Sequence, residues 1–182
     1  MSVKSDLPEG WIWVRSERDL SIQTLSRAGE TASRMATDTD LTPREPESIQ
    51  DLEALMSDVL TPIVKRYGGF LLTHGFTGYE VIKKIKSRIA PELDQHAASE
   101  KNPKGKQICK RGGCSVDLIL PSGDSLELAR FIIAELPFDR LYFYAEDKPI
   151  HVSHNVIENV RSIVRFDFGS RGNRVPRVVK NL

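Results

Sequence analysis

The most regular pattern in the chain is helical and covers residues 49–67. Its apolar side chains recur at three- and four-residue spacing: Leu52, Leu55, Met56, Val59, Leu60 and Val64. That spacing places them on one face of an α-helix. Ser48 is a suitable N-cap for this helix, and Pro62 inside the pattern predicts a kink. Gly68 and Gly69 predict where the helix ends.

Two further helices and a small set of strands follow from the same reading. Residues 79–89 and 125–136 are amphipathic at helical spacing, which predicts helices. Runs rich in β-branched and aromatic residues predict strands, and these runs are residues 70–73, 115–120, 140–144 and 150–153. The order of elements predicts an α+β fold, with a small, mainly antiparallel sheet and helices packed on its outer face.

The N-terminal part has a weaker pattern. Residues 11–14, Trp-Ile-Trp-Val, fit either a short buried strand or a loop anchored by two indole rings. Helical turns are expected within residues 19–35, and residues 37–46 have the composition of a linker. We therefore expect residues 1–47 to form an N-terminal extension.

The C-terminal residues 155–182 are expected to begin as a helix and to lose any pattern after Gly169. They form a basic tail, because residues 161–182 hold a single acid, Asp167. The basic residues of this stretch are Arg161, Arg165, Arg171, Arg174, Arg177 and Lys180. Such a tail can contact nucleic-acid phosphates, so nucleic acid is one candidate partner. Residues 48–154 are expected to form the folded domain.

Composition narrows the class of protein. Hydrophobic residues make up 40% and charged residues 28% of the chain, and the formal net charge is +1, as in ordinary globular proteins. We see neither an apolar run of the roughly 18 residues that a membrane span needs nor a secretory signal, so we expect a cytoplasmic protein without membrane contact. Cys109 and Cys114 are expected to be free thiols, because their spacing does not fit a zinc knuckle.

The candidate chemistry lies with the histidines, each of which adjoins a predicted strand or its end. Zinc favours imidazole nitrogen and carboxylate oxygen, and catalytic sites use three such ligands. His96, Asp117 and His151 would supply such a set from one loop and two strands. Spacing alone does not select them, since a single histidine is more often a structural or surface residue.

Three segments carry a resemblance to a known family. They are Asp94-Gln95-His96, Gly113-Cys114-Ser115-Val116-Asp117 and Pro149-Ile150-His151-Val152-Ser153. They resemble the Ser-x-His-x-x-Gly-x-Ala-x-Asp motif and the later Val-His-Val-Ser strand of the zinc D-Ala-D-Ala carboxypeptidase family, which has the hedgehog/DD-peptidase fold. Residues 72–76 are similar to that family's Thr-Ser-Gly-Tyr-Arg segment. The resemblance covers residues 48–154 and implies a Zn²⁺ ion bound by His96, Asp117 and His151.

The resemblance implies a zinc-dependent hydrolase that acts on a peptide or small amide substrate, with metal-activated water attacking a carbonyl. The family's arginine that grips a substrate carboxylate corresponds to Thr77 here, and the spacer after His96 is longer. Arg88, Arg111 and Arg140 are the alternative arginines. The family's glutamate base corresponds to Tyr144 by position, and nearby Glu146 is the residue that we expect to be the general base.

Other residues complete the predicted site. His74 is either a transition-state donor at the pocket wall or a water-exposed histidine at a strand end. His154 falls on the opposite face of its strand from His151, so a supporting role is expected. With Arg88, Arg111 and Tyr144, His154 makes up the predicted substrate-binding set. The alternative function is a catalytically altered or inactive metal-binding module of the same fold, acting through protein or nucleic-acid contacts.

Overall fold

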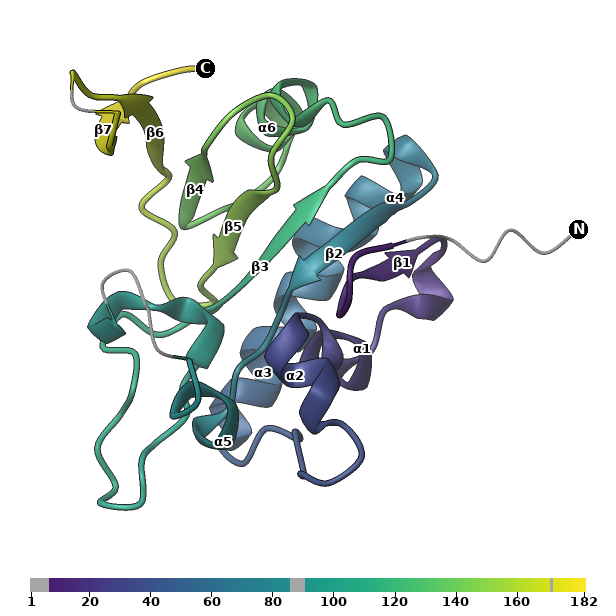
Figure 1. The fold of residues 1–182 in the computed structure, drawn as a ribbon, viewed down its shortest axis with the longest axis vertical. Helices are drawn as coiled ribbons and strands as arrows, with labels where there is room; N and C mark the ends of the chain where they lie inside the picture. Colours follow the sequence, from purple (N-terminus) through teal and green to yellow (C-terminus); the bar gives the residue numbers. More distant parts are fainter. Residues whose placement is uncertain (1–6, 86–90, 171) are drawn as a thin grey trace, which may run out of the picture.

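The structure, a computed structural model, describes residues 7–85, 91–170 and 172–182 (Figure 1). Its strands are β1 (Ile12–Val14), β2 (Phe70–His74), β3 (Cys114–Ile119), β4 (Arg140–Phe143), β5 (Ile150–His154), β6 (Ser162–Phe168) and β7 (Arg174–Val179). They form one seven-stranded sheet in the order β1-β2-β3-β5-β4-β6-β7. Neighbouring strands are antiparallel except β4 and β6, which are parallel. The fold is therefore α+β with a mixed sheet.

The helices lie mostly in the first half of the described chain. The α-helices are α1 (Ile22–Arg27), α2 (Glu30–Met35), α3 (Pro46–Leu55), α4 (Thr61–Tyr67), α5 (Tyr79–Ile82) and α6 (Ser125–Glu135). The shorter helical segments are η1 (Glu17–Asp19), η2 (Met56–Leu60), η3 (Pro91–Leu93) and η4 (Gln95–Ala97). Within the described residues, no helix combines the length and the apolar character that crossing a membrane requires.

The helix predicted over residues 49–67 is confirmed as α3, η2 and α4 in unbroken succession. It begins earlier than expected, with Pro46 in its first turn, where the missing amide of proline costs no hydrogen bond. Ser48 lies inside the helix and accepts a hydrogen bond from the backbone of Ser99. Just before Pro62 the helix widens into the π-turn η2. Gly68 ends it in a left-handed conformation, with φ of 74°.

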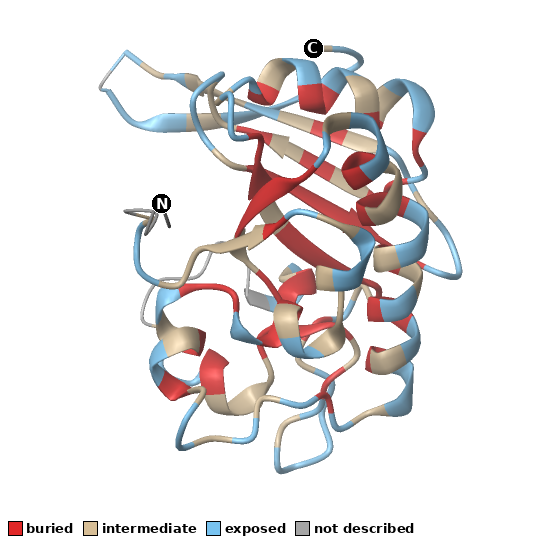
Figure 2. Ribbon diagram, turned by 90° about the vertical axis from the view of Figure 1, so that its right-hand side faces the viewer, coloured by how far each residue is buried: buried red, intermediate tan, exposed pale blue. Residues whose placement is uncertain are grey.

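One face of the sheet packs against α3, α4 and α6 and forms the main core. Strand residues of this core are Val116, Leu118, Leu141, Ile150 and Val152, and helix residues are Leu52, Leu55, Leu60, Leu128 and Ile132, all fully buried. Figure 2 shows that buried positions run along the central strands and recur on the helices packed against them. The alternation of each strand leaves every second side chain on the other face, so that face is available for a site.

The N-terminal and C-terminal parts of the chain both contribute strands to the sheet. In the part expected to be an extension, β1 pairs with β2, and Val14 and Leu25 belong to the main core. The expected helix after Asn155 is wrong: this part of the chain forms β6 and β7, and Ile163 is buried in the core. The alternation of β-branched and aromatic residues in β6 suits a strand, and β4 supplies its parallel partner.

The helix predicted over residues 79–89 is shorter in the structure. α5 ends at Ile82, Ile85 is not helical, and residues 86–89 lie outside the described residues. The apolar residues here do not share one face: Val81 packs in a cluster with Ala32 and Met35, whereas Ile82 packs with Ala97. Val81 and Ile82 therefore point into two different apolar clusters, and a long helix with one apolar face does not form within the described residues 79–85.

The central position of Leu118 in the core gives a stability prediction. Replacing Leu118 with alanine should lower the free energy of unfolding by about 2–5 kcal/mol, because a fully buried side chain leaves a cavity. Urea unfolding followed by circular dichroism measures this loss. Ile157→Ala is the matched control, since Ile157 is 91% exposed and its removal should change stability by less than about 0.5 kcal/mol. Equal effects of the two variants would contradict the described core.

Candidate metal centre

A row of polar and aromatic side chains crosses the sheet on the face opposite the main core. The pairing places His74 of β2 next to Asp117 of β3, Asp117 next to His151 of β5, and His151 next to Tyr142 of β4. Directly paired residues of neighbouring strands point to the same face. The neighbouring residue Leu118 points into the core. The sheet thus brings together residues that are far apart in the sequence.

His96 joins this row from outside the sheet. It lies in the 3₁₀ turn η4, where the side chain of Asp94 accepts a hydrogen bond from its backbone amide at 3.1 Å. Its ring Nδ1 donates to the carbonyl of Gly75 at 3.0 Å. That bond fixes the tautomer and leaves Nε2 free to act as a ligand. Nε2 faces Asp117 Oδ1 at 3.3 Å.

The ligand atoms of His96, Asp117 and His151 all lie within 4.8 Å of one another, an arrangement that can hold a metal ion. Two ligands of a tetrahedral ion, each about 2.1 Å from it, lie about 3.4 Å apart. The separation of His96 Nε2 from Asp117 Oδ1 matches this value. His151 Nδ1 lies only 2.8 Å from Asp117 Oδ1, a hydrogen bond that would open slightly around an ion. The structure thus brings together the three side chains that the resemblance implies as ligands.

The electrostatics of the cluster favour a bound cation. Burial alone would raise the pKa of Asp117, but the neighbouring rings of His96 and His151 outweigh it and hold that pKa far below its usual range. Burial works against a proton on His96, yet the charge and hydrogen bond of Asp117 raise the pKa of His96. Asp117 is thus an ionised carboxylate facing two imidazoles. A metal ion bound there would take the place of the proton that Asp117 favours on His96.

His74 lies beside the cluster as a neutral imidazole. Its ring centroid is 4.5 Å from that of His96. Burial, together with the positive charge of His96, lowers the pKa of His74 to about 4. Gly29 makes room for the ring, because a Cβ on Gly29 would lie 2.6 Å from His74 Nδ1. At neutral pH, His74 can therefore donate one hydrogen bond without carrying a charge.

Aromatic side chains extend the row on the other side of the cluster. Tyr142 stacks on His151, with ring centroids 4.7 Å apart and planes 19° apart, and Tyr144 stacks on Phe166. Burial, with the negative charge of Asp117, raises the pKa of Tyr144, so its hydroxyl stays protonated. The guanidinium of Arg174 lies over the ring of Tyr144. We name Tyr142, Tyr144, Phe166, Phe168 and Arg174 the aromatic wall.

The other predicted site residues lie in different places. Arg111 binds both carboxylate oxygens of Asp139. His154 lies on the core face, as strand alternation predicts, with Nε2 3.5 Å from Asp58. Glu146 is exposed in the turn between β4 and β5, and among the described residues no hydrogen bond or ion pair joins its carboxylate to the cluster. Arg88 lies outside the described residues.

The sequence-based reasoning missed several residues that support the cluster. Gly75 contributes a backbone carbonyl, Asp94 caps the turn of His96, and Tyr142 stacks on His151. Only Asp94 left a usable signal, because an aspartate two residues before a candidate ligand fits a capped turn. Tyr142 gives no such signal, because an aromatic residue in a strand usually packs against neighbouring strands, and the carbonyl of Gly75 carries no sequence signal.

Compared with protein-family models, with curated proteins and with solved structures, the chain gives no match. The interpretation of the cluster therefore rests on its geometry and on the chemistry of its three side chains.

Substitution of a proposed ligand should abolish metal binding. Wild-type protein stripped with chelator should bind a single Zn²⁺ ion per chain and unfold at a higher temperature with zinc, because an ion that binds only the folded state stabilises it. His96→Ala and His151→Ala should lose both effects. Isothermal titration and thermal unfolding measure them.

His154→Ala is the matched control for this experiment, because His154 belongs to the same strand as His151 but faces the core. It should lower stability and still bind zinc. Loss of zinc in His154→Ala, or its retention in His96→Ala, would contradict the described ligand set.

Proposed function

We propose that the protein is a zinc-dependent amide or peptide hydrolase resembling the D,D-carboxypeptidases of the hedgehog/DD-peptidase fold. The observation that carries this proposal is the convergence of His96, Asp117 and His151 on one point. Two imidazoles and a carboxylate are a common ligand set for catalytic zinc. The carboxylate of Asp117 is 29% exposed, so the centre is reachable from solvent.

A zinc ion bound there would supply a Lewis acid for a substrate carbonyl and lower the pKa of a bound water. The protein residues around it have complementary roles. His74, uncharged at neutral pH, donates a hydrogen bond to the oxygen on which negative charge develops. The protonated hydroxyl of Tyr144 orients the substrate. Glu146 is the residue that we assign as proton acceptor.

The substrate side of the centre differs from that of the resembled family. Thr77, at the position of the family's carboxylate-binding arginine, is fully buried and donates its backbone amide to the carbonyl of His96. The aromatic wall flanks the cluster instead, and Phe168 in it is 74% exposed. We therefore propose a substrate with apolar groups near the cleaved bond, for which a free C-terminal carboxylate is not required.

Hydrolysis tests the proposal directly. Zinc-loaded protein is incubated with D-Ala-D-Ala peptides, with their C-terminal amides and with peptides carrying aromatic side chains, and released amines are quantified. The amides and the aromatic peptides should be cleaved at least as fast as the free acids. Binding of zinc without cleavage of any of these substrates would instead support the metal-binding module.

Substitution of Glu146 tests its proposed role as the proton acceptor. Glu146→Gln should lower kcat by about 10²–10⁴-fold, because it removes the group that accepts the proton, and should leave zinc affinity unchanged. Asp147→Asn is the matched control, since Asp147 is a neighbouring exposed acid of the same turn, and its kcat should not change. Full activity of Glu146→Gln would assign the base elsewhere.

A further inference from the structure

The turn that carries His96 is tied to the sheet by its neighbour Gln95. The side-chain amide of Gln95 donates to the carboxylate of Asp139 at 2.9 Å and to the carbonyl of Gly112 at 2.8 Å. Gln95 is 1% exposed and Asp139 is fully buried. The position of His96 is thus coupled to a buried carboxylate at the beginning of β4.

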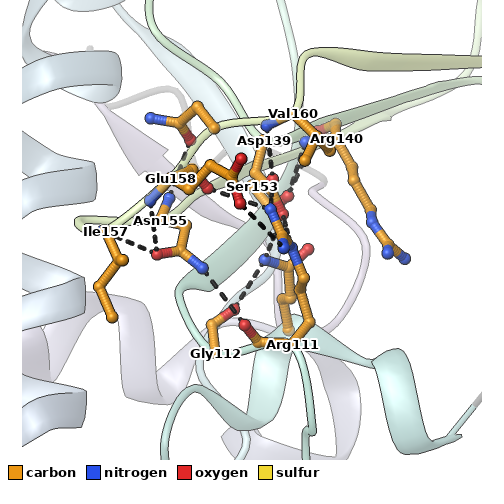
Figure 3. A network of polar contacts seen from close by, with 11 residues as sticks. Arg111, Gly112, Asp139, Arg140, Ser153, Asn155, Ile157, Glu158 and Val160 are labelled. Carbon is orange, nitrogen blue, oxygen red and sulfur yellow. Dashed lines mark hydrogen bonds and ion pairs between the residues drawn. The ribbon is translucent and has the colours of Figure 1, made fainter.

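Asp139 collects hydrogen bonds from further parts of the chain (Figure 3). Arg111 donates to both of its oxygens, from Nη2 at 2.7 Å and from Nε at 3.1 Å. The backbone amide of Val160 donates to Oδ1 at 3.0 Å. Burial alone would raise the pKa of Asp139, but these bonds outweigh it and lower that pKa. The carboxylate is therefore ionised and fully bonded inside the protein.

The three segments that meet at Asp139 are those that carry the three proposed metal ligands. Gln95 directly precedes His96. Arg111 lies just before β3, which carries Asp117, and Val160 lies in the connection that leads from β5, which carries His151, to β6. The backbone amide of Asp139 also donates to the carbonyl of Ser153 in β5 at 2.7 Å.

We propose that Asp139 is a positioning residue of the metal centre, which holds the three ligand-bearing segments in the arrangement that binds the ion. This inference rests on the proposed metal centre and goes beyond it, because Asp139 touches neither the ligands nor the substrate. Its direct partners are Gln95, Arg111 and Val160.

Irregular backbone explains why such positioning is needed. η4 is a single 3₁₀ turn, and Gly112 and Gly113 before β3 both have φ of 71°. At Gly113 the chain passes so close to β5 that a Cβ would lie 2.3 Å from the carbonyl of His154. Such segments have few intrinsic constraints, and groups that orient the ligands from outside commonly change metal affinity by about 10–100-fold.

A second arrangement of a carboxylate between arginines provides the matched control. Asp167 of β6 binds Arg165 at 2.7 Å and Arg177 at 3.3 Å, on the hairpin of β6 and β7. Asp167→Asn removes the same charge and a similar set of bonds as Asp139→Asn. It contacts none of the segments that carry a metal ligand.

The experiment measures metal affinity of folded protein at low temperature. Zn²⁺ affinity is determined by competition with a chromophoric chelator, and the visible spectrum of the Co²⁺ form reports the geometry around the ion. Asp139→Asn should bind zinc about 10–100-fold more weakly and change the Co²⁺ spectrum. Gln95→Met, which keeps the side-chain length but loses both bonds of Gln95, should shift both readouts in the same direction. Asp167→Asn should match the wild type.

The outcomes separate the two proposals. If wild-type protein binds no metal, the metal centre itself is wrong. If wild-type protein binds zinc and Asp139→Asn binds it equally well with an unchanged Co²⁺ spectrum, Asp139 only stabilises the fold and the inference is overturned. If Asp139→Asn does not fold, Gln95→Met decides: unchanged affinity and spectrum in this variant overturn the inference.

Discussion

The register between β3 and β5 is the constraint on which the rest of the structure depends. It places the carboxylate of Asp117 against the ring of His151, and His96 then approaches the same carboxylate from η4. A slip of one residue would turn every side chain of β3 to the other face. Asp117 would then enter the apolar core, where an ionised carboxylate without partners is strongly unfavourable.

The same register links the packing of the core to the positions of the proposed metal ligands. Val116 and Leu118 stand on either side of Asp117 in β3 and are fully buried in the core. The core therefore fixes the strands, and the strands fix Asp117 and His151 on the opposite face. His74 and Tyr142 extend this row to both sides. A single pattern of alternation thus separates the packed face of the sheet from the face that carries the cluster of His96, Asp117 and His151.

Particular elements show what the sequence can and cannot reveal. The long helix up to Gly68 and the helix α6 were predictable, because apolar residues at helical spacing report local structure. His96, Asp117 and His151 were predicted through a resemblance, since the spacing of three distant residues does not define a site. The strand β6 was missed although its residues suit a strand, because Val156, Val160, Ile163 and Val164 also recur at helical spacing. The roles of the Gly75 carbonyl and of Asp139 depend on contacts that only the folded chain creates.

X-ray absorption spectroscopy at the zinc edge of the zinc-loaded wild-type protein tests the metal centre most directly. We expect a first shell of nitrogen and oxygen alone at about 2.0–2.2 Å, with the outer-shell scattering of two imidazole rings. Cys109 and Cys114, both buried free thiols, should contribute nothing. Sulfur scattering at about 2.3 Å, or a shell without two imidazoles, would contradict a centre built from His96, Asp117 and His151.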